Sequence, residues 1–257
     1  MSSTHHALGI ALILAAGPAL AGGYLAPGAA PDAARILPPP PAPGSGRAAE
    51  DRAVFEATRA LKGQPRWDLA VSDADLAADT ALEKFACALG VRIMPSSAPA
   101  LSRILARSED DAEAVYGPAK KAFARPRPFT APGEEAAPLC VTRTPELARS
   151  FSYPSGDATL GWAWGLILAE LAPSRSSEIL MRARSIGESR VVCGVHNPSD
   201  VEASRTAGAA LVAALHANAE FRADMDKARA EVTAVLAAPH GAEQCSVQDA
   251  AAAKSPY

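Results

Sequence analysis

The sequence predicts an all-α protein built around a single compact helical domain. Alanine, which has the highest intrinsic helix propensity, occupies 60 of the 257 positions. Aromatic residues, which favour strands, make up only 5% of the chain. Apolar residues recur at the three- and four-residue spacing of amphipathic helices. A content of 49% hydrophobic and 21% charged residues excludes a disordered chain, and a net charge of −3 argues against a nucleic-acid binder.

The first 21 residues predict a cleaved signal peptide. Residues 7–17 form an uncharged apolar run that is too short to cross a bilayer, and Ala19 and Ala21 occupy the positions that signal peptidase reads. A buried N-terminal helix is the alternative. We expect a mature, periplasmic or secreted chain that begins near Gly22 and has no membrane partner. Residues 22–47 follow as a Pro-rich arm, because the consecutive prolines at 38–41 favour an extended conformation.

Helical periodicity begins at Ala48 and predicts one domain over residues 48–240. A first helix has apolar residues at 54, 57 and 61, and a second has them at 76, 82, 85 and 89. A third helix begins near Ser96 and is expected to stop at Gly117-Pro118, because proline interrupts helices. Five prolines between 126 and 146 predict a long loop. Further helices are expected over residues 158–171, 176–192, 201–221 and 224–237, before a C-terminal tail, 241–257, that is poorly ordered from Gln244.

The four cysteines allow three different pairings in an exported protein, and the sequence does not choose among them. They are Cys87, Cys140, Cys193 and Cys245. One or two structural disulfides are expected. Because there is no Cys-x-x-Cys pair, a zinc ribbon or a thioredoxin-like site is not supported.

Three clusters combine polar or charged residues with Gly or Pro near a helix boundary. The first, residues 120–128, reads KKAFARPRP and holds four cations in a mildly acidic chain. The second, residues 153–159, reads YPSGDAT and places a turn before a helix, whose free N–H groups form an anion site. The third, residues 189–200, reads SRVVCGVHNPSD. Its His196 precedes Asp200 by four residues, so the carboxylate can orient the imidazole.

Each cluster also has a structural explanation when it is taken alone. The cations could form a solvated basic face, and Ser155 or Asp157 could be only a helix N-cap. Elsewhere, Arg182 and Arg184 are expected on a solvated helix face, and His216 is expected to be structural.

Together and in this order, the clusters resemble the signature of the PAP2 acid phosphatase superfamily, which also contains the vanadium-dependent haloperoxidases. The matching patterns are Lys-x6-Arg-Pro, Pro-Ser-Gly and Ser-Arg-x5-His-x3-Asp. The Pro-rich arm, Pro65-Arg66-Trp67, the Arg-Pro-Arg-Pro-Phe run 125–129 and the Leu-His-Ala-Asn run 215–218 resemble, more narrowly, the bacterial class A nonspecific acid phosphatases. The resemblance covers about residues 24–230.

This resemblance implies an acid phosphatase that hydrolyses phosphate monoesters with broad specificity and needs no metal or other cofactor. It also implies a homo-oligomer. His196 would attack phosphorus to give a phosphohistidine, and Asp200 would orient His196 and stabilise its charge. The phosphate oxygens would be bound by Lys120, Arg127, Arg190, Ser155 and the N–H of Gly156, groups that suit a tetrahedral anion.

The chain departs from the family pattern at Asp157, where relatives carry the histidine that protonates the leaving oxygen. One interpretation makes Asp157 the general acid, which its ordinary pKa of about 3.9 would favour only in acid. In the other, Asp157 is a helix cap and the chain is a catalytically impaired phosphate-binding homologue. A vanadate-dependent haloperoxidase is a further alternative. Asn197, where many relatives have an aromatic residue, would alter the pocket wall.

Overall fold

The computed structural model describes residues 22–238 and 245–257, so the predicted signal peptide lies outside the described residues. Every regular element in these two ranges is a helix, which confirms the all-α prediction. No helix within them is long and apolar enough to cross a bilayer. The first helices along the chain are α1 (Ala33–Ile36), α2 (Gly46–Arg59), α3 (Pro65–Asp73), α4 (Ala78–Leu89) and α5 (Pro99–Phe123). Two 3-10 turns, Pro128–Thr130 and Pro173–Arg175, and the short helix α6 (Pro145–Arg149) lie in the connections.

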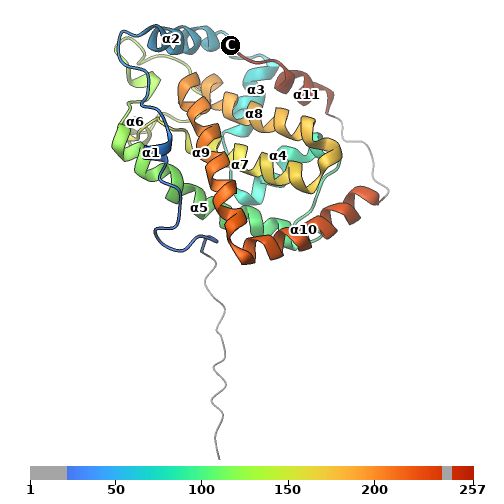
Figure 1. Cartoon of the computed structure of the whole chain (residues 1–257). Coiled ribbons are helices and arrows are strands. Elements are labelled where there is room, and N and C mark those ends of the chain that lie inside the picture. The colour runs from blue at the N-terminus through green and yellow to red at the C-terminus, as the bar shows by residue number, and fades with distance from the viewer. Residues whose placement is uncertain (1–21, 239–244) are drawn as a thin grey trace, which may run out of the picture.

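Helix α7 (Gly156–Leu171) lies at the centre of the molecule, between α8 (Ser176–Val192) and α9 (Pro198–Ala217) (Figure 1). Most of its side chains are buried, in keeping with its nearly continuous apolar sequence. Helix α9 comes very close to α7 at Gly208, where a Cβ atom would lie only 2.7 Å from the backbone oxygen of Thr159. Glycine therefore permits the contact that fixes the two helices against each other.

The predicted end of the third helix at Gly117-Pro118 is wrong. Helix α5 continues through Pro118 to Phe123. Val115 and Ala119, which flank the proline, are fully buried, whereas Pro118 itself is exposed. The backbone carbonyl that loses its partner can bond to water, and packing of the buried neighbours holds the helix together. The boundary between the two helices predicted over residues 201–221 and 224–237 also differs. Asn218 ends α9 and caps α10 (Ala219–Ala237).

The chain after residue 244 is not a poorly ordered tail. Residues Ser246–Ala253 form helix α11, which packs on α3 and α8 and buries Ala251 and Ala252. A disulfide between Cys87 and Cys245 attaches this helix to α4, and the second disulfide joins Cys140 to Cys193. The structure thus selects one of the three pairings that the sequence leaves open.

Arg182 does not lie on a solvated face as expected. Its side chain is 3% exposed and forms a buried ion pair with Asp73 of α3. It also donates a hydrogen bond to the carbonyl of Lys84 at 2.9 Å. A buried guanidinium needs such a set of partners, because each ion taken out of water loses its hydration.

Candidate active site

The C-terminal end of α5 brings the first cationic cluster toward the start of α7. Lys120 lies in the last turn of α5 and donates to the carbonyl of Phe151 at 2.8 Å. Ala124 ends the helix with a φ of 46°, in the left-handed region. The chain then runs beside the segment before α7, where the N–H of Ser152 donates to the carbonyl of Arg125 at 2.8 Å. The four cations are therefore separated, and only Lys121 is exposed among them.

Arg127 of the first cluster lies directly against His196 of the third cluster. The Nη1 atom of Arg127 lies 3.1 Å from Nε2 of His196 and also donates to the carbonyl of Val195 at 2.9 Å. Its Nε donates to Ser150 Oγ at 2.8 Å, so both ends of the guanidinium are held. Because a guanidinium only donates, Nε2 of the imidazole faces it with its lone pair.

Asp200 lies on the other side of the imidazole and is completely buried. Its Oδ2 atom is 3.4 Å from Nδ1 of His196 and accepts the N–H of Asn197 at 2.8 Å. Its Oδ1 atom accepts from Arg125 at 2.5 Å. A carboxylate facing Nδ1 favours the tautomer with the proton on that nitrogen, which leaves Nε2 unprotonated.

The segment Ser155-Gly156 begins α7, two residues before the predicted start at residue 158. Ser155 is the N-cap and accepts the N–H of Ala158 on its hydroxyl at 3.3 Å. Its own N–H donates to Ser204 of α9 at 2.8 Å, which joins the starts of α7 and α9. Gly156 packs against the ring of Tyr116, where a Cβ atom would lie 2.9 Å from Cζ. The N–H groups of Gly156 and Asp157 at the start of this turn have no acceptor within the helix and can bind an anion.

Asp157 is not the helix cap that one interpretation of the sequence made it. It lies in the first turn of α7, and its Oδ2 atom forms an ion pair with Nε of Arg190 at 2.9 Å. The guanidinium of Arg190 also donates to the carbonyl of Ala74 at 3.3 Å. The side chain of Asp157 is 37% exposed and that of Arg190 only 8%, so the carboxylate lies on the solvent side of the cluster.

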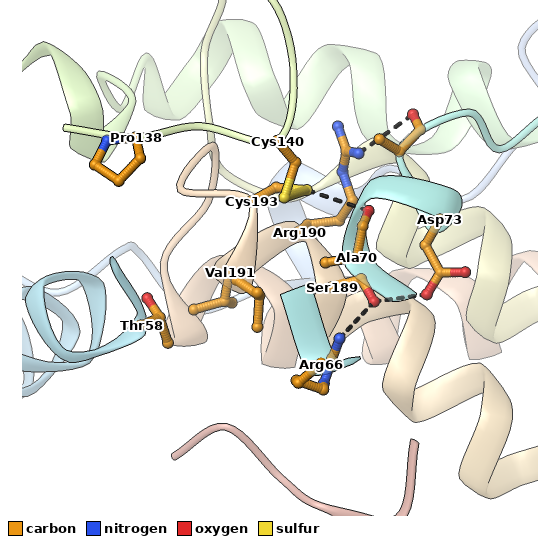
Figure 2. The surroundings of a disulfide bond; sticks show 12 residues. Thr58, Arg66, Ala70, Asp73, Pro138, Cys140, Ser189, Arg190, Val191 and Cys193 are labelled. Carbon is orange, nitrogen blue, oxygen red and sulfur yellow. Dashed lines mark hydrogen bonds between the residues drawn. A yellow bond between two sulfur atoms is a disulfide. The ribbon is translucent and has the colours of Figure 1, made fainter. Parts of the chain in front are cut away.

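The serine of the Ser-Arg pair is structural. Ser189 donates to Asp73 Oδ2 at 2.6 Å and accepts from Arg66 at 3.0 Å, as Figure 2 shows. These contacts hold α8 to α3 beside Arg190. Farther along the segment, Cys193 forms its disulfide with Cys140. The residues before His196 are therefore held by the contacts of Ser189 and by this disulfide.

The charges at this site act strongly on one another. Burial, and then Arg127, Lys120 and Arg190, lower the pKa of His196 well below its ordinary value. Burial and the Arg127 charge lower the pKa of Lys120 to about 8, and burial and Arg190 lower that of Arg127 to about 10. The structure therefore gathers three cations around a neutral imidazole, an arrangement that an anion with several oxygens would relieve.

Sequence reasoning missed the part that Arg125 and Asp51 play in this site. In the sequence, Arg125 is one cation of a basic cluster and the first residue of the Arg-Pro-Arg-Pro-Phe run, and nothing marks Asp51. The two side chains form an ion pair at 2.7 Å directly behind Asp200. The Arg-Pro-Arg-Pro run was the only signal, and it could not show which arginine turned inward. Within residues 22–238 and 245–257, no three His, Cys, Asp or Glu side chains are placed to share a metal ion.

Comparison with known proteins agrees with the signature. The sequence model of the PAP2 superfamily matches residues 104–223 of this chain. The chain is 39% identical to an acid phosphatase of Zymomonas mobilis over 84% of this chain and 81% of that protein. It is 38% identical to a non-specific acid phosphatase of Providencia stuartii over 81% of this chain and 84% of that protein. It is 34% identical to a non-specific acid phosphatase of Salmonella typhimurium over 76% of this chain and 78% of that protein. The chain therefore belongs to the PAP2 superfamily, in the family of the bacterial non-specific acid phosphatases.

Proposed function

We propose that this protein is an acid phosphatase that hydrolyses phosphate monoesters through a phosphohistidine on His196. The observation that carries the proposal is the fully buried imidazole. Its Nε2 atom lies 3.1 Å from Arg127, while its Nδ1 atom faces Asp200. Arg127, Arg190 and Lys120 supply the positive charge that a phosphoryl group requires, and the N–H groups of Gly156 and Asp157 at the start of α7 supply hydrogen-bond donors. Family membership supports the assignment.

In the first step, Nε2 of His196 attacks phosphorus, a P–N bond forms, and the P–O bond to the alcohol breaks. The ring then carries a positive charge, which the carboxylate of Asp200 stabilises. Water next attacks phosphorus, the P–N bond breaks, and inorganic phosphate leaves. The lowered pKa of His196 matters here, because only a neutral imidazole can attack, and this ring stays neutral into the acid range. In this mechanism the cations and N–H donors of the site carry these steps without a metal ion.

The leaving alcohol needs a proton, and we assign that proton to Asp157. Its carboxyl group lies one residue after Gly156 and on the solvent side of the cationic cluster. When phosphate binds Arg190 in place of Asp157, the Asp157 carboxyl group becomes free to donate its proton to the leaving oxygen. The carboxylate that results can later accept a proton from the attacking water. The family's usual histidine is absent, so the carboxyl group of Asp157 is the group at this position that can donate the proton.

Broad specificity follows from which part of the substrate is bound. The phosphoryl group would enter between the buried side chains of Arg127 and Arg190, whereas the alcohol would lie near the partly exposed side chain of Asp157 and make few contacts. A periplasmic or secreted location fits the predicted signal peptide and the two disulfides, which form in oxidising compartments. The homo-oligomer remains an expectation from the family resemblance.

The test is phosphate release from nitrophenyl phosphate between pH 4 and 8, without vanadate or peroxide, by the wild type and by His196→Ala. His216→Ala is the matched control, because His216 lies in α9 and contacts Glu170 at 2.9 Å instead of the site. We expect loss of activity only in His196→Ala, and an acid-labile, base-stable phosphoryl label on the quenched wild type. Phosphate binding without release would support the impaired homologue, and bromination only with vanadate and peroxide would support the haloperoxidase.

A further inference from the structure

A buried charge network lies directly behind the proposed nucleophile. One terminal nitrogen of Arg125 donates to Asp200 Oδ1 at 2.5 Å and to Ser199 Oγ at 2.7 Å. The other donates to Asp51 Oδ2 at 2.7 Å. Asp51 also accepts the N–H of Ser199 at 3.0 Å and the hydroxyl of the same residue. The arginine thus joins α2 to the first turn of α9, just beyond His196.

The three charged side chains are removed from water almost completely. Their exposed fractions are 0% for Asp200, 5% for Asp51 and 14% for Arg125. A buried carboxylate keeps its charge only where a cation and hydrogen-bond donors replace its hydration. Arg125 is the cation in direct contact with Asp200, and the second carboxylate, Asp51, keeps the guanidinium in the orientation that this contact needs.

We propose that Arg125, anchored by Asp51, is a positioning residue that holds the Asp200 carboxylate ionised and aligned with the ring of His196. This inference rests on the proposed function, because an ionised Asp200 matters most while His196 carries the phosphoryl group and a positive charge. Arg125 acts through Asp200 and does not touch the phosphate. It differs in this from Arg127, two residues later, which contacts the imidazole itself.

The charged and titratable groups around Asp200 come from several elements. Burial raises the pKa of Asp200, and the charge of Arg125 is the main influence that lowers it, followed by the N–H of Asn197 and the charge of Lys120. Arg127 and Tyr153 also interact with this carboxylate, and His196 beside it stays neutral. Without Arg125, Asp200 would therefore take up a proton at a higher pH, and activity would fail earlier as the solution is acidified.

If Arg125 had a purely structural role, its removal would lower activity at every pH and would not move the acid limb of the pH profile. Arg143 is a suitable control, because it anchors the same proline-rich loop without contacting Asp200. It donates to the carbonyls of Phe129 at 3.0 Å, Glu134 at 3.1 Å and Ala137 at 3.2 Å. Removing Arg143 loosens the loop and leaves the charge of the network intact.

The network can also be reached from outside. A cavity of about 630 Å³ is lined by Asp51, Arg125 and Asn197, together with prolines of the arm and of the loop after α5. Free guanidinium ion is small enough to enter such a space. It can therefore replace the missing group when Arg125 is truncated to alanine.

The experiment compares pH profiles of kcat and kcat/KM for nitrophenyl phosphate in the wild type, Arg125→Ala, Arg125→Lys and Arg143→Ala. We expect the acid limb of the kcat profile of Arg125→Ala to shift to higher pH by about 1 to 3 pH units. This is the range by which an opposite charge shifts the pKa of a carboxyl group. KM should change less than kcat, and added guanidinium chloride should restore activity, whereas equal ionic strength of sodium chloride should not. Arg125→Lys should keep the acid limb near its wild-type position, and so should Arg143→Ala.

An unchanged acid limb in Arg125→Ala, with equal losses at every pH and no rescue by guanidinium, would overturn the inference. If circular dichroism shows that the alanine variant does not fold, we would measure the same pH profile for Arg125→Gln, which keeps hydrogen-bonding capacity without charge. The position of its acid limb then decides the question in the same way. The two proposals fail separately. Full activity of His196→Ala would refute the proposed function, whereas an inactive His196→Ala with a normal Arg125→Ala profile would refute only the role of Arg125.

Discussion

Removal of the Cys140–Cys193 disulfide should weaken both the fold and the active site. The bond closes a loop of 53 residues. Chain-entropy arithmetic for a loop of that length gives about 4 kcal/mol of unfolding free energy, which corresponds to a fall in Tm of about 10 °C for a protein of this size. Cys193 is fully buried and lies three residues before His196, and its sulfur lies 3.3 Å from the carbonyl oxygen of Ala70. A loosened segment would displace the imidazole.

We would measure urea unfolding and kcat/KM for Cys140→Ala/Cys193→Ala, with Cys87→Ala/Cys245→Ala as the matched control. The second disulfide closes a loop of 158 residues, for which the same arithmetic gives about 5 kcal/mol, but it fastens α11 far along the chain from His196. Both variants should lose stability. Only the first should lose kcat/KM at 25 °C, by about 10- to 100-fold, the scale of a small misplacement of a reacting group. A loss of less than about 1 kcal/mol, or equal activity losses in the two variants, would refute this reasoning.

Two further predictions concern single residues of the site. Since burial and the neighbouring Arg127 lower the pKa of Lys120 to about 8, and only the ammonium form attracts phosphate, kcat/KM should fall as the pH rises through about 8. Lys120→Arg should move this alkaline limb upward by at least about one pH unit, because arginine stays protonated, and a limb that stays in place would exclude Lys120 as its source. Asp157→Asn should slow hydrolysis of glycerol phosphate by about 10²- to 10⁴-fold and that of nitrophenyl phosphate by less than about tenfold, because only the alkyl alcohol needs the proton. Equal losses for the two substrates in steady-state assays would remove Asp157 from leaving-group protonation.

The local features of the fold could be predicted because helix periodicity and caps are local. The helix over residues 176–192 matches α8 at both ends, and the N-cap of α7 is Ser155, one of the two residues that the sequence offers for that role. Pro118 shows where local rules fail. Its cost to the helix is a local property, whereas the burial of Val115 and Ala119 depends on the helices packed around them.

Charged residues show more clearly which features the local sequence predicts and which depend on tertiary packing. Arg182 and Arg125 resemble ordinary surface arginines in the sequence, since nothing nearby along the chain marks them as buried. Their partners are 109 and 74 residues away, at Asp73 and Asp51. A pairing over such distances is decided by how α2, α3 and α8 pack, and no local pattern reports it.

The sequence by itself determined the helical class, the export signal as a prediction, and the set of residues that carries the PAP2 signature, because each depends on residue type and spacing along the chain. The tertiary structure decided which cysteines pair, that α11 folds back onto α3, and which cations turn toward His196. It also decided that Asp200 is ion-paired with Arg125 and that Asp157 faces Arg190. The physical reason is that burial and charge pairing depend on distances in space, which are set only when the helices pack.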